Sequence, residues 1–548
     1  MRATTALLWG TLTVLAVLIL GLYGQRGFRA VVDYQARQAQ MGKVAVLVGG
    51  DVSLRDVPKA YEILRGGVFR DPYYRGEAHW YPFLMPLAAA LMARATGQEV
   101  PVAYLNLEVV TTTLYLIGAS ALIAAMAGGW SLALIPLAIL LGWLMPGHGL
   151  YPGQAARGAM CLFLVLAGFL WGDVPARRSP WTYLGLGLAI GVLGLWHVAS
   201  LSISGGLGLV LLTRFVLRAR KPGTRLDLRR PGLLLLGAAL PLSLLLGPQL
   251  LRYHTLKANR YAALWIEPYL GKSAADALRL ALVPRDAGLI LISVFLLRVV
   301  AGRRLGLRRW RRAEPLAIAW FVCLVLGHVG FLLADETRPW LKDVLEHLIP
   351  VPPHTFWELA LGLAPVLKVL GMLSLVQMAA RVLPRWAGYR DGVAAWNARP
   401  SWAQPLLALP FAAALLFRPP VPEPLVASSE SRELFEFSKK VAATVGDTAV
   451  FFRYPGRLLQ GGALKIPLVS VWEYANPYVQ HERSAALDKV DAALDRGDAS
   501  EARRYFRRYG FGYLMEDPRR KDPVIEACGG SEVMRHEGYV LRRYGRCR

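Results

Sequence analysis

Charged residues are scarce in this chain: Asp, Glu, Lys and Arg make up 18% of its 548 residues, whereas 55% are hydrophobic. Long polar stretches are also few, because apolar runs return at short intervals from residue 6 to about residue 417. A soluble protein of this length does not carry so many runs of membrane-spanning length. The scarcity of polar sequence therefore excludes an ordinary soluble protein and indicates a polytopic α-helical membrane protein.

Acidic residues are scarcer than basic ones, with 38 Asp and Glu against 63 Lys and Arg, so the net charge is +25. This excess does not indicate a nucleic-acid partner, because the basic residues form no stripe with interleaved base-stacking aromatics. They lie largely in short connectors between apolar runs, which is typical of loops retained in the cytoplasm. We therefore expect membrane lipids and no nucleic acid as partners.

Several catalytic motifs are absent, and only four cysteines occur. The chain has no Walker loop, no zinc-type spacing of Cys and His, and no Ser-centred nucleophile elbow. It also has no clear two-half repeat and no matching pair of Gly/Pro-broken spans, which many secondary transporters show. These absences argue against a nucleotide hydrolase, a zinc enzyme, an α/β-hydrolase and a repeat-built transporter.

Eleven apolar runs are predicted to span the membrane. The first, residues 6–24, follows Arg2 and has no small-residue cleavage site after it, so it reads as an uncleaved signal anchor with a cytoplasmic N-terminus. The others lie at about 103–127, 131–146, 154–172, 181–197, 200–217, 232–251, 287–301, 315–333, 357–380 and 403–417. Residues 84–95 are apolar but too short to cross, so we expect them to lie at the interface or to re-enter.

The distribution of arginine supports this count. With a cytoplasmic N-terminus, four arginine-bearing connectors fall on the cytoplasmic side, at 173–180, 218–230, 302–314 and 381–402. The outer side receives longer segments rich in Trp, Tyr, His and Pro, namely 25–83, 146–153, 252–286, 334–356 and the tail from residue 418. We therefore expect the functional site on the outer face of an integral cell (inner) membrane protein.

The tail changes character after the proline-rich linker 418–424. Periodicity predicts helices at 430–444, 484–495 and 499–508, alternating with short strands at 448–452, 468–472, 511–515 and 538–542. Two domains follow: residues 1–417, a membrane domain with the outer loop 25–83, and residues 418–548, a soluble α/β domain outside the membrane.

Cys528 and Cys547 lie in this tail, where an oxidising environment preserves cysteine pairs. Cys528 follows a short helical pattern and Cys547 follows the last predicted strand, so the chain can return beside its starting point. A bridge requires the two Cα atoms to lie within about 7 Å. The alternative is a pair of free thiols in a frayed C-terminus.

The polar segment 49–86 carries the candidate catalytic carboxylates, Asp51 and Asp56. A partly desolvated carboxylate within hydrogen-bond reach of an acceptor hydroxyl can take its proton. Each residue also has a plainer interpretation. Asp51 follows Gly49-Gly50 and suits a solvated turn, whereas Asp56 precedes Pro58 and a helical pattern and suits a helix cap.

An aromatic entry, His79-Trp80-Tyr81, precedes Pro82 and the next apolar run. Trp and Tyr favour the depth of lipid headgroups, so the three residues suit an interfacial belt. They equally suit a wall of the site that faces a sugar or a lipid.

Five cationic or ionisable residues are candidates for binding a phosphate group at the outer surface. His197 lies where an apolar stretch of more than thirty residues must turn. Arg252, His254, Lys257 and Arg260 follow the span 232–251 within nine residues. Such side chains snorkel to anionic lipid at the headgroup boundary, and they also stabilise charge that develops on a phosphate leaving group.

These features together resemble the GT-C superfamily of integral-membrane glycosyltransferases that use polyprenyl-phosphate sugars. The resemblance covers the early anchor, the outer loop with Asp51, the pattern Ala60, Leu64, Gly67, and the entry Tyr81-Pro82-Phe83-Leu84, where the family has Tyr-Pro-Pro-Leu. It also covers the glycine-rich span ending at His197 and the tail segments 509–515 and 537–542.

The resemblance implies a function and a site. Asp51, about fifteen residues before Gly66-Gly67, would be the catalytic aspartate and general base of an inverting transferase. A polyprenyl-phosphate sugar would be the donor, and a glycan, lipid or protein would be the acceptor. Many members have a second acid next to the first, whereas Val52 stands here, so we expect no obligatory metal.

Two other functions stay open from the sequence. One is a non-enzymatic transporter or assembly factor for lipid-linked glycans, which should hold ionisable residues deep in several spans. Lys368 is one of few such residues here. The other is an enzyme of another class, either a lipid A phosphoethanolamine-type transferase or an O-antigen-ligase-like protein. A ligase would use a diphosphate donor, which the loop 252–286 would serve with its cations.

Overall fold

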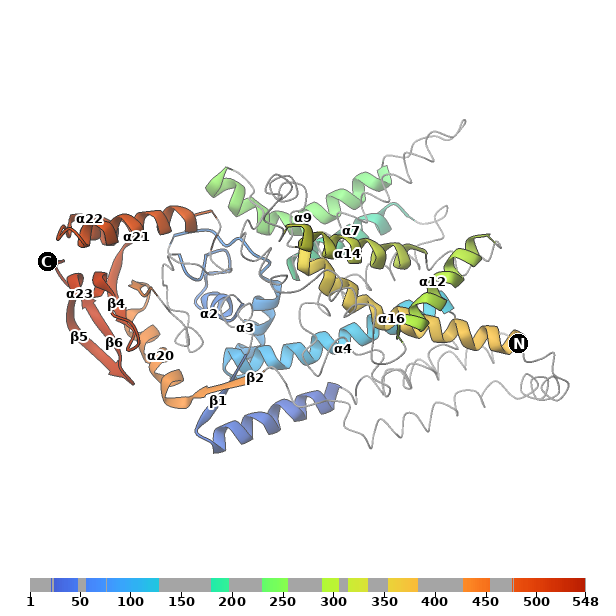
Figure 1. Ribbon diagram of the computed structural model, residues 1–548, viewed down its shortest axis with the longest axis horizontal. Helices are drawn as coiled ribbons and strands as arrows, with labels where there is room; N and C mark the ends of the chain where they lie inside the picture. The colour runs from blue at the N-terminus through green and yellow to red at the C-terminus, as the bar shows by residue number, and fades with distance from the viewer. Residues whose placement is uncertain are drawn as a thin grey trace.

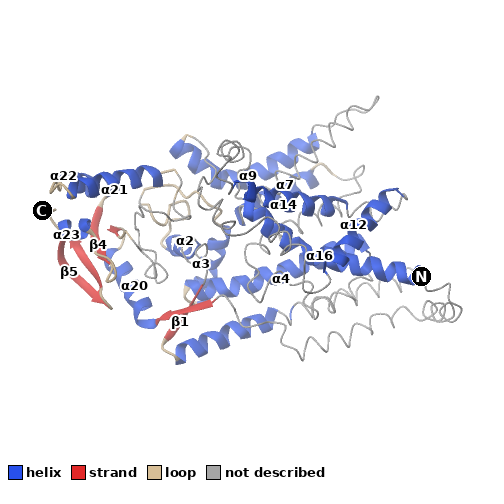
Figure 2. Ribbon diagram, viewed as in Figure 1, coloured by secondary structure: helices blue, strands red, loops and turns tan. Residues whose placement is uncertain are grey.

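The computed structural model describes residues 21, 24–47, 56–74, 76–127, 179–196, 229–254, 288–304, 314–333, 353–382, 427–453, 476 and 478–547. Long helices fill one part of the molecule, and a small domain of helices and strands lies at the other end (Figure 1). Helices dominate the membrane part and strands are concentrated in the C-terminal domain (Figure 2). The predicted boundary at residue 417 lies outside the described residues, so the division into two domains at that point stays a prediction.

Six of the predicted spans coincide with helices. They are α4 (Val100–Ala127), α7 (Trp181–Trp196), α9 (Arg229–Tyr253), α12 (Gly288–Arg304), α14 (Glu314–Leu333) and α16 (Pro353–Val382). The predicted spans 131–146, 154–172, 200–217 and 403–417, and nearly all of 6–24, lie outside the described residues. The count of eleven therefore stays a prediction.

Two of the described helices are long and apolar enough to cross a membrane, by length and composition alone. They are Val100–Ser120 within α4, with a mean hydropathy of 1.4, and α9, with 1.8. Much of α4 is buried within the protein, whereas α9 turns a row of leucines outward, among them Leu235, Leu240 and Leu251. An exposed leucine face on a long helix suits contact with lipid chains.

Helices α7 and α9 pack with almost no side chain between them. A Cβ atom added to Gly187 would lie 2.2 Å from the carbonyl oxygen of Leu234, and one added to Gly237 would lie 2.4 Å from that of Leu184. Small residues permit such close backbone approach between membrane helices. The glycine-rich run of α7 is thus explained by its contact with α9.

Residues 25–83, predicted to lie outside and named the first outer segment, contain several elements in their described part. A helix covers residues 24–40, the strand β1 (Lys43–Leu47) follows, and the short helix α2 (Val57–Leu64) begins beside Pro58. Helix α3 (Leu84–Thr96) comes next, and at 13 residues it is about 20 Å long, too short to cross a bilayer.

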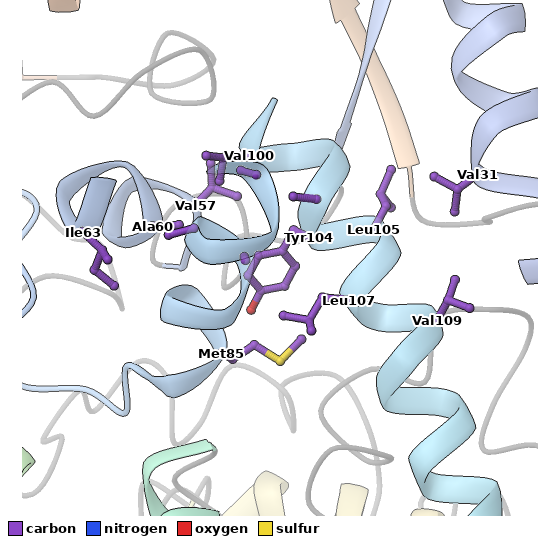
Figure 3. Packing of buried hydrophobic residues seen from close by; sticks show 14 residues of the cluster. Val31, Val57, Ala60, Ile63, Met85, Val100, Tyr104, Leu105, Leu107 and Val109 are labelled. Carbon is purple, nitrogen blue, oxygen red and sulfur yellow. The ribbon is translucent and has the colours of Figure 1, made fainter. Parts of the chain in front are cut away.

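One apolar cluster joins these elements to α4. Val31 from the first helix, Val57 and Ala60 from α2 and Met85 from α3 pack against the α4 residues around Tyr104 (Figure 3). Helix α2 and helix α3 lie between the long helices and the C-terminal domain (Figure 1). The cluster therefore fixes α2 on the membrane domain.

The C-terminal domain contains β2 (Ala427–Ser431), α20 (Arg432–Val445), β3 (Ala449–Phe451), α21 (Gln480–Leu494), α22 (Ser500–Tyr509), β4 (Phe511–Glu516), α23 (Pro523–Cys528), β5 (Gly529–His536) and β6 (Tyr539–Tyr544). A four-stranded sheet has the order β3-β4-β6-β5, with β3 and β4 parallel and the other pairs antiparallel. The three predicted helices and the strands near 448–452, 511–515 and 538–542 are confirmed, and residues 468–472 lie outside the described residues.

Two strand features were not predicted. The edge strand β5 begins with Gly529-Gly530 and has no regular alternation of apolar residues, so its sequence gives a weak signal. Strand β1 pairs with β2 in a separate antiparallel two-stranded sheet, across more than 380 residues of sequence. This pairing ties the first outer segment to the start of the C-terminal domain.

The predicted bridge between Cys528 and Cys547 is confirmed. The two cysteines form a disulfide with their Cα atoms 3.9 Å apart, and both are buried in the core between α22, α23 and the sheet. The bridge closes the last part of the chain onto the end of α23.

Candidate active site

Asp56 stands at the start of α2 and is 3% exposed. Its side chain makes no capping hydrogen bond to the helix, so the interpretation as a side-chain cap is wrong. The hydroxyl of Tyr104 on α4 instead donates to Oδ2 of Asp56 at 2.6 Å. This bond turns the carboxylate toward α4 and fixes its direction.

Lys59 follows Asp56 by about one helical turn and is fully buried. Its Nζ donates to the carbonyl oxygen of Gly67 at 3.2 Å and to that of Arg70. Burial lowers the pKa of Lys59 to about 7, although the charges of Asp71 and Glu62 act in the opposite direction. Lys59 thereby connects α2 to the residues 67–70 that follow the helix.

Asp71 is a buried carboxylate that the sequence analysis did not single out. It is 2% exposed, and its Oδ1 accepts from the backbone N–H groups of Tyr73 and Tyr74 at 2.8 and 2.9 Å. Burial raises its pKa to about 6, against the effects of the two hydrogen bonds and of the cations Lys59 and Arg483. The turn signal Asp-Pro at Asp71 was available in the sequence.

Tyr73 and Tyr74 belong to the core of the C-terminal domain. Both are buried, and they pack with residues of α20, β3, β4 and β6, namely Leu434, Phe437, Val441, Val450, Met515 and Leu541. The turn that Asp71 organises thus inserts two aromatic side chains from the first outer segment into a domain that begins about 350 residues later.

Glu77 lies at a junction of three parts of the chain. Its carboxylate is 3.4 Å from Nε of Arg252 at the end of α9 and 3.4 Å from Nη2 of Arg483 on α21. The hydroxyl of Tyr253 donates to the same carboxylate at 3.1 Å. Arg252, predicted to bind phosphate, is therefore paired with Glu77, while its side chain stays about half exposed.

A second set of contacts surrounds the ring of Tyr253. The rings of Tyr253 and Tyr478 stack with centroids 4.1 Å apart. Asn476 donates to the carbonyl oxygen of Ala78 and to the Tyr253 hydroxyl, and the Tyr478 hydroxyl donates to Gln249 on α9. These bonds dock the C-terminal domain on the C-terminal end of α9.

Two of the three residues of the aromatic entry are buried, and Trp80 is partly exposed. His79 and Tyr81 are buried, and the His79 ring meets the edge of Phe83 at 6.5 Å between centroids. The carbonyl oxygen of Trp80 accepts from the side chain of Gln249 at 3.3 Å. Their role as a substrate wall stays a prediction.

Several other predicted site residues are not brought together by the described structure. His254 is exposed just beyond α9, with a φ of 53°. Asp51, His197, Lys257 and Arg260 lie outside the described residues. Their roles as base and as phosphate ligands stay predictions.

A candidate metal-binding group lies elsewhere, on the C-terminal domain. Ligand atoms of Glu433, His536 and Glu537 lie within 4.8 Å of one another. The two glutamates are exposed, and exposed acidic groups of this kind commonly occur without an ion. The group makes no contact with Asp56 or Asp71 that the structure records.

Comparison with known proteins gives structural neighbours only. No protein-family model and no curated protein matches the chain. The chain is similar to the arabinofuranosyltransferase AftD from Mycobacteria, with a TM-score of 0.50 and 15% identity over 97% of this chain and 40% of AftD. It thus spans less than half the length of AftD.

Two further solved structures give lower scores. ArnT from Cupriavidus metallidurans in the apo state has a TM-score of 0.49 and 14% identity, over 97% of this chain and 98% of ArnT. The archaeal oligosaccharyltransferase AglB from Archaeoglobus fulgidus, in complex with an inhibitory peptide and a dolichol-phosphate, has 0.45 and 12%, over 94% of this chain and 72% of AglB.

AftD, ArnT and AglB are all GT-C membrane glycosyltransferases. At these identities the likeness shows the fold and nothing finer, so the GT-C resemblance predicted from the sequence is confirmed for the fold. The leucine face of α9 and the likeness in fold both support the integral membrane protein predicted from the sequence, and its orientation stays a prediction.

Proposed function

We propose that this GT-C chain is an inverting glycosyltransferase that moves a sugar from a polyprenyl-phosphate donor to an acceptor hydroxyl at the outer face of the membrane. One observation carries the proposal. The first outer segment holds the carboxylate of Asp56 buried against the membrane domain, where it makes no capping bond to its own helix and accepts a hydrogen bond from the Tyr104 hydroxyl. A general base needs such a desolvated and oriented carboxylate.

The proposed reaction has one displacement step. The base takes the proton of the acceptor hydroxyl while its oxygen forms a bond to the anomeric carbon. The bond from that carbon to the phosphate oxygen breaks, and polyprenyl phosphate leaves with the bonding electron pair. Attack opposite to the leaving group inverts the anomeric configuration.

Two carboxylates of the same segment are candidates for the base. The family resemblance assigns the role to Asp51, and the described geometry favours Asp56, five residues later. Cations near the outer end of α9 would stabilise the charge on the leaving phosphate. We assign this role to His197, Arg252, His254, Lys257 and Arg260, as in the sequence analysis.

The test uses the full chain in lipid nanodiscs with a labelled polyprenyl-phosphate sugar and its acceptor. Removing a general base should lower the transfer rate by about a hundredfold to ten-thousandfold. We expect this loss for Asp56→Asn and compare it with Asp51→Asn. Asp33→Asn, an exposed aspartate on the helix 24–40, is the matched control. Full activity of both Asp51 and Asp56 variants would refute a base in this segment.

The donor class is tested separately by mass spectrometry of lipid that co-purifies with the chain. A polyprenyl-phosphate hexose or pentose supports the proposal. A polyprenyl-diphosphate glycan would favour the ligase-like alternative instead, and a glycolipid that is moved without being cleaved would favour a transporter or assembly factor.

A further inference from the structure

Arg483 on α21 is a charged residue inside the contact between the two domains. It is 4% exposed, and its guanidinium carbon lies 4.5 Å from the ring centroid of Tyr74 and 4.4 Å from that of Tyr509. A guanidinium stacks on aromatic rings through its planar faces and keeps its edge for hydrogen bonds. Tyr74 belongs to the first outer segment, whereas Tyr509 belongs to the C-terminal domain.

The edge of the same guanidinium faces Glu77. Its Nη2 is 3.4 Å from Oε1, and both side chains are largely buried. A buried charge that loses its partner costs far more than an exposed one, because it is left desolvated. Arg483 therefore contacts the first outer segment at two points, the ring of Tyr74 and the carboxylate of Glu77, one on each side of residue 75.

The residues between α2 and Tyr74 link the contacts of Arg483 to Asp56. Asp71 holds the turn at Tyr73 and Tyr74, and its carboxyl lies in the electrostatic field of Arg483 and of Lys59. Lys59 then binds the carbonyl oxygens of Gly67 and Arg70 from within α2. Asp56 stands at the start of this helix.

We propose that Arg483 is a positioning residue, by which the C-terminal domain holds residues 71–78 and, through Lys59, the start of α2 in the geometry that the reaction needs. The inference rests on the proposed function, in which Asp56 is the base. A purely structural Arg483 would stabilise the C-terminal domain and leave turnover at saturating substrate unchanged.

The first measurement needs no activity. Hydrogen exchange of the nanodisc-embedded chain is followed in peptides from residues 67–80 and from α20. Arg483→Met, which keeps the length of the side chain but removes its charge and planar group, should speed exchange in residues 67–80 by about tenfold or more and leave α20 protected. Arg508→Met is the matched control, because Arg508 pairs with Glu482 and lies 5.4 Å from the ring centroid of Tyr509, and none of its recorded contacts is to residues 67–80.

The second measurement is steady-state transfer under the conditions of the first test. Arg483→Met should lower kcat by about tenfold and change the KM for the donor by less than about twofold, because misplacement of the base weakens the transition state and not ground-state binding. Arg483→Lys should restore part of kcat, since it retains the charge toward Glu77 without the planar stack. Arg508→Met should match the wild type.

A double-mutant cycle with Glu77→Gln guards against simple unfolding. If Arg483 acts through Glu77, the effects of the two variants on kcat will be less than additive. The inference is overturned by unchanged exchange in residues 67–80, by equal loss of protection in α20, or by additive effects. A wild-type chain without turnover would remove the proposed function, while the exchange experiment would still decide whether Arg483 holds the segment.

Discussion

At the scale of single residues, the site is built from charges that are out of contact with water. Asp56, Lys59 and Asp71 are all buried, and each is bound to a different neighbour: the Tyr104 hydroxyl, the carbonyl oxygens of Gly67 and Arg70, and the N–H groups after Asp71. Polar contacts of this kind offset the cost of desolvation only in a single arrangement. The buried charges therefore favour one arrangement of α2 and the turn after it, and they make the stability of that arrangement dependent on pH.

Asp71 gives a test of this dependence. Because burial raises its pKa from 3.8 to about 6, the folded state holds a proton that the unfolded state has lost. The associated stability is present below about pH 4 and is lost as pH rises through about 6, and two pKa units correspond to roughly 3 kcal/mol. As the pH rises from about 4 to about 6, where Lys59 with its pKa of about 7 stays largely protonated, the thermal midpoint of Asp71→Asn should fall less than that of the wild type.

The measurement is intrinsic tryptophan fluorescence of the detergent-solubilised chain during heating. Glu62, Glu77 and Arg483, which also lie near Asp71 or Lys59, stay in place in the variant. Asp488→Asn, an exposed residue of α21, serves as the control and should follow the wild type. If the thermal midpoints of Asp71→Asn and of the wild type change with pH in parallel, Asp71 is ionised throughout this range, and the prediction is wrong.

At the scale of elements, helix packing in the membrane domain depends on backbone contact. The face of α7 with Gly187 and Gly191 meets the face of α9 with Gly237, and the backbone atoms of the two helices leave no room for a Cβ. Lipid offers no hydrophobic drive to hold two helices together, so close packing has to supply the attraction.

Gly187→Val should therefore separate α7 from α9. Its Cβ would stand 2.2 Å from a backbone oxygen, which cannot rotate away as a side chain can. We expect a loss of about 1–3 kcal/mol or more, seen as a lower thermal midpoint and a smaller monodisperse peak in fluorescence-detected size exclusion. Gly185→Val is the control, because no atom lies within 4 Å of a Cβ at that position. Equal behaviour of the two variants would contradict the packing explanation.

The C-terminal disulfide is the second element-scale feature. A bridge across 19 residues should stabilise the domain by about 3 kcal/mol on the chain-entropy estimate. The double variant Cys528→Ser, Cys547→Ser should therefore unfold its C-terminal domain at a lower temperature. Mass spectrometry of peptides digested without reductant should find the two cysteines linked, and ready alkylation of both thiols without reductant would contradict this.

At the scale of the whole molecule, the first outer segment and the C-terminal domain form one unit at one end of the membrane domain. Strand β1 pairs with β2, Tyr73 and Tyr74 enter the C-terminal core, and Glu99 pairs with Lys439 at 2.7 Å. The C-terminal domain must therefore lie on the same side of the membrane as the first outer segment, whichever side that is.

The predicted orientation places this unit outside the cell membrane. A cysteine at Asp495, an exposed position after α21, should react with a membrane-impermeant maleimide in intact spheroplasts. A cysteine at Arg308, in the connector 302–314, should react only after the membrane is opened. The reverse pattern would overturn the orientation and the position of the site, while leaving the contact between the two ends unaffected.

Local patterns were enough to determine several parts of this protein. The lengths of the apolar runs predicted six helices to within a few residues. A run of about 20 apolar residues that crosses a membrane forms a helix in nearly all cases. Alternation and turn residues predicted most of the C-terminal elements. The disulfide was predicted because the short chain between Cys528 and Cys547 can fold back beside its starting point. The resemblance to the GT-C fold also came from short motifs in the sequence.

Only the tertiary structure decided what the buried charges do. Asp56 has the sequence context of a helix cap, and its bond to Tyr104 depends on a residue 48 positions away. Asp71, Glu77 and Arg483 have ordinary surface-type sequence contexts, and their burial arises because the C-terminal domain folds over the first outer segment. Periodicity reports which face of an element is apolar, but contacts across 400 residues depend on how the elements assemble, which no local pattern records.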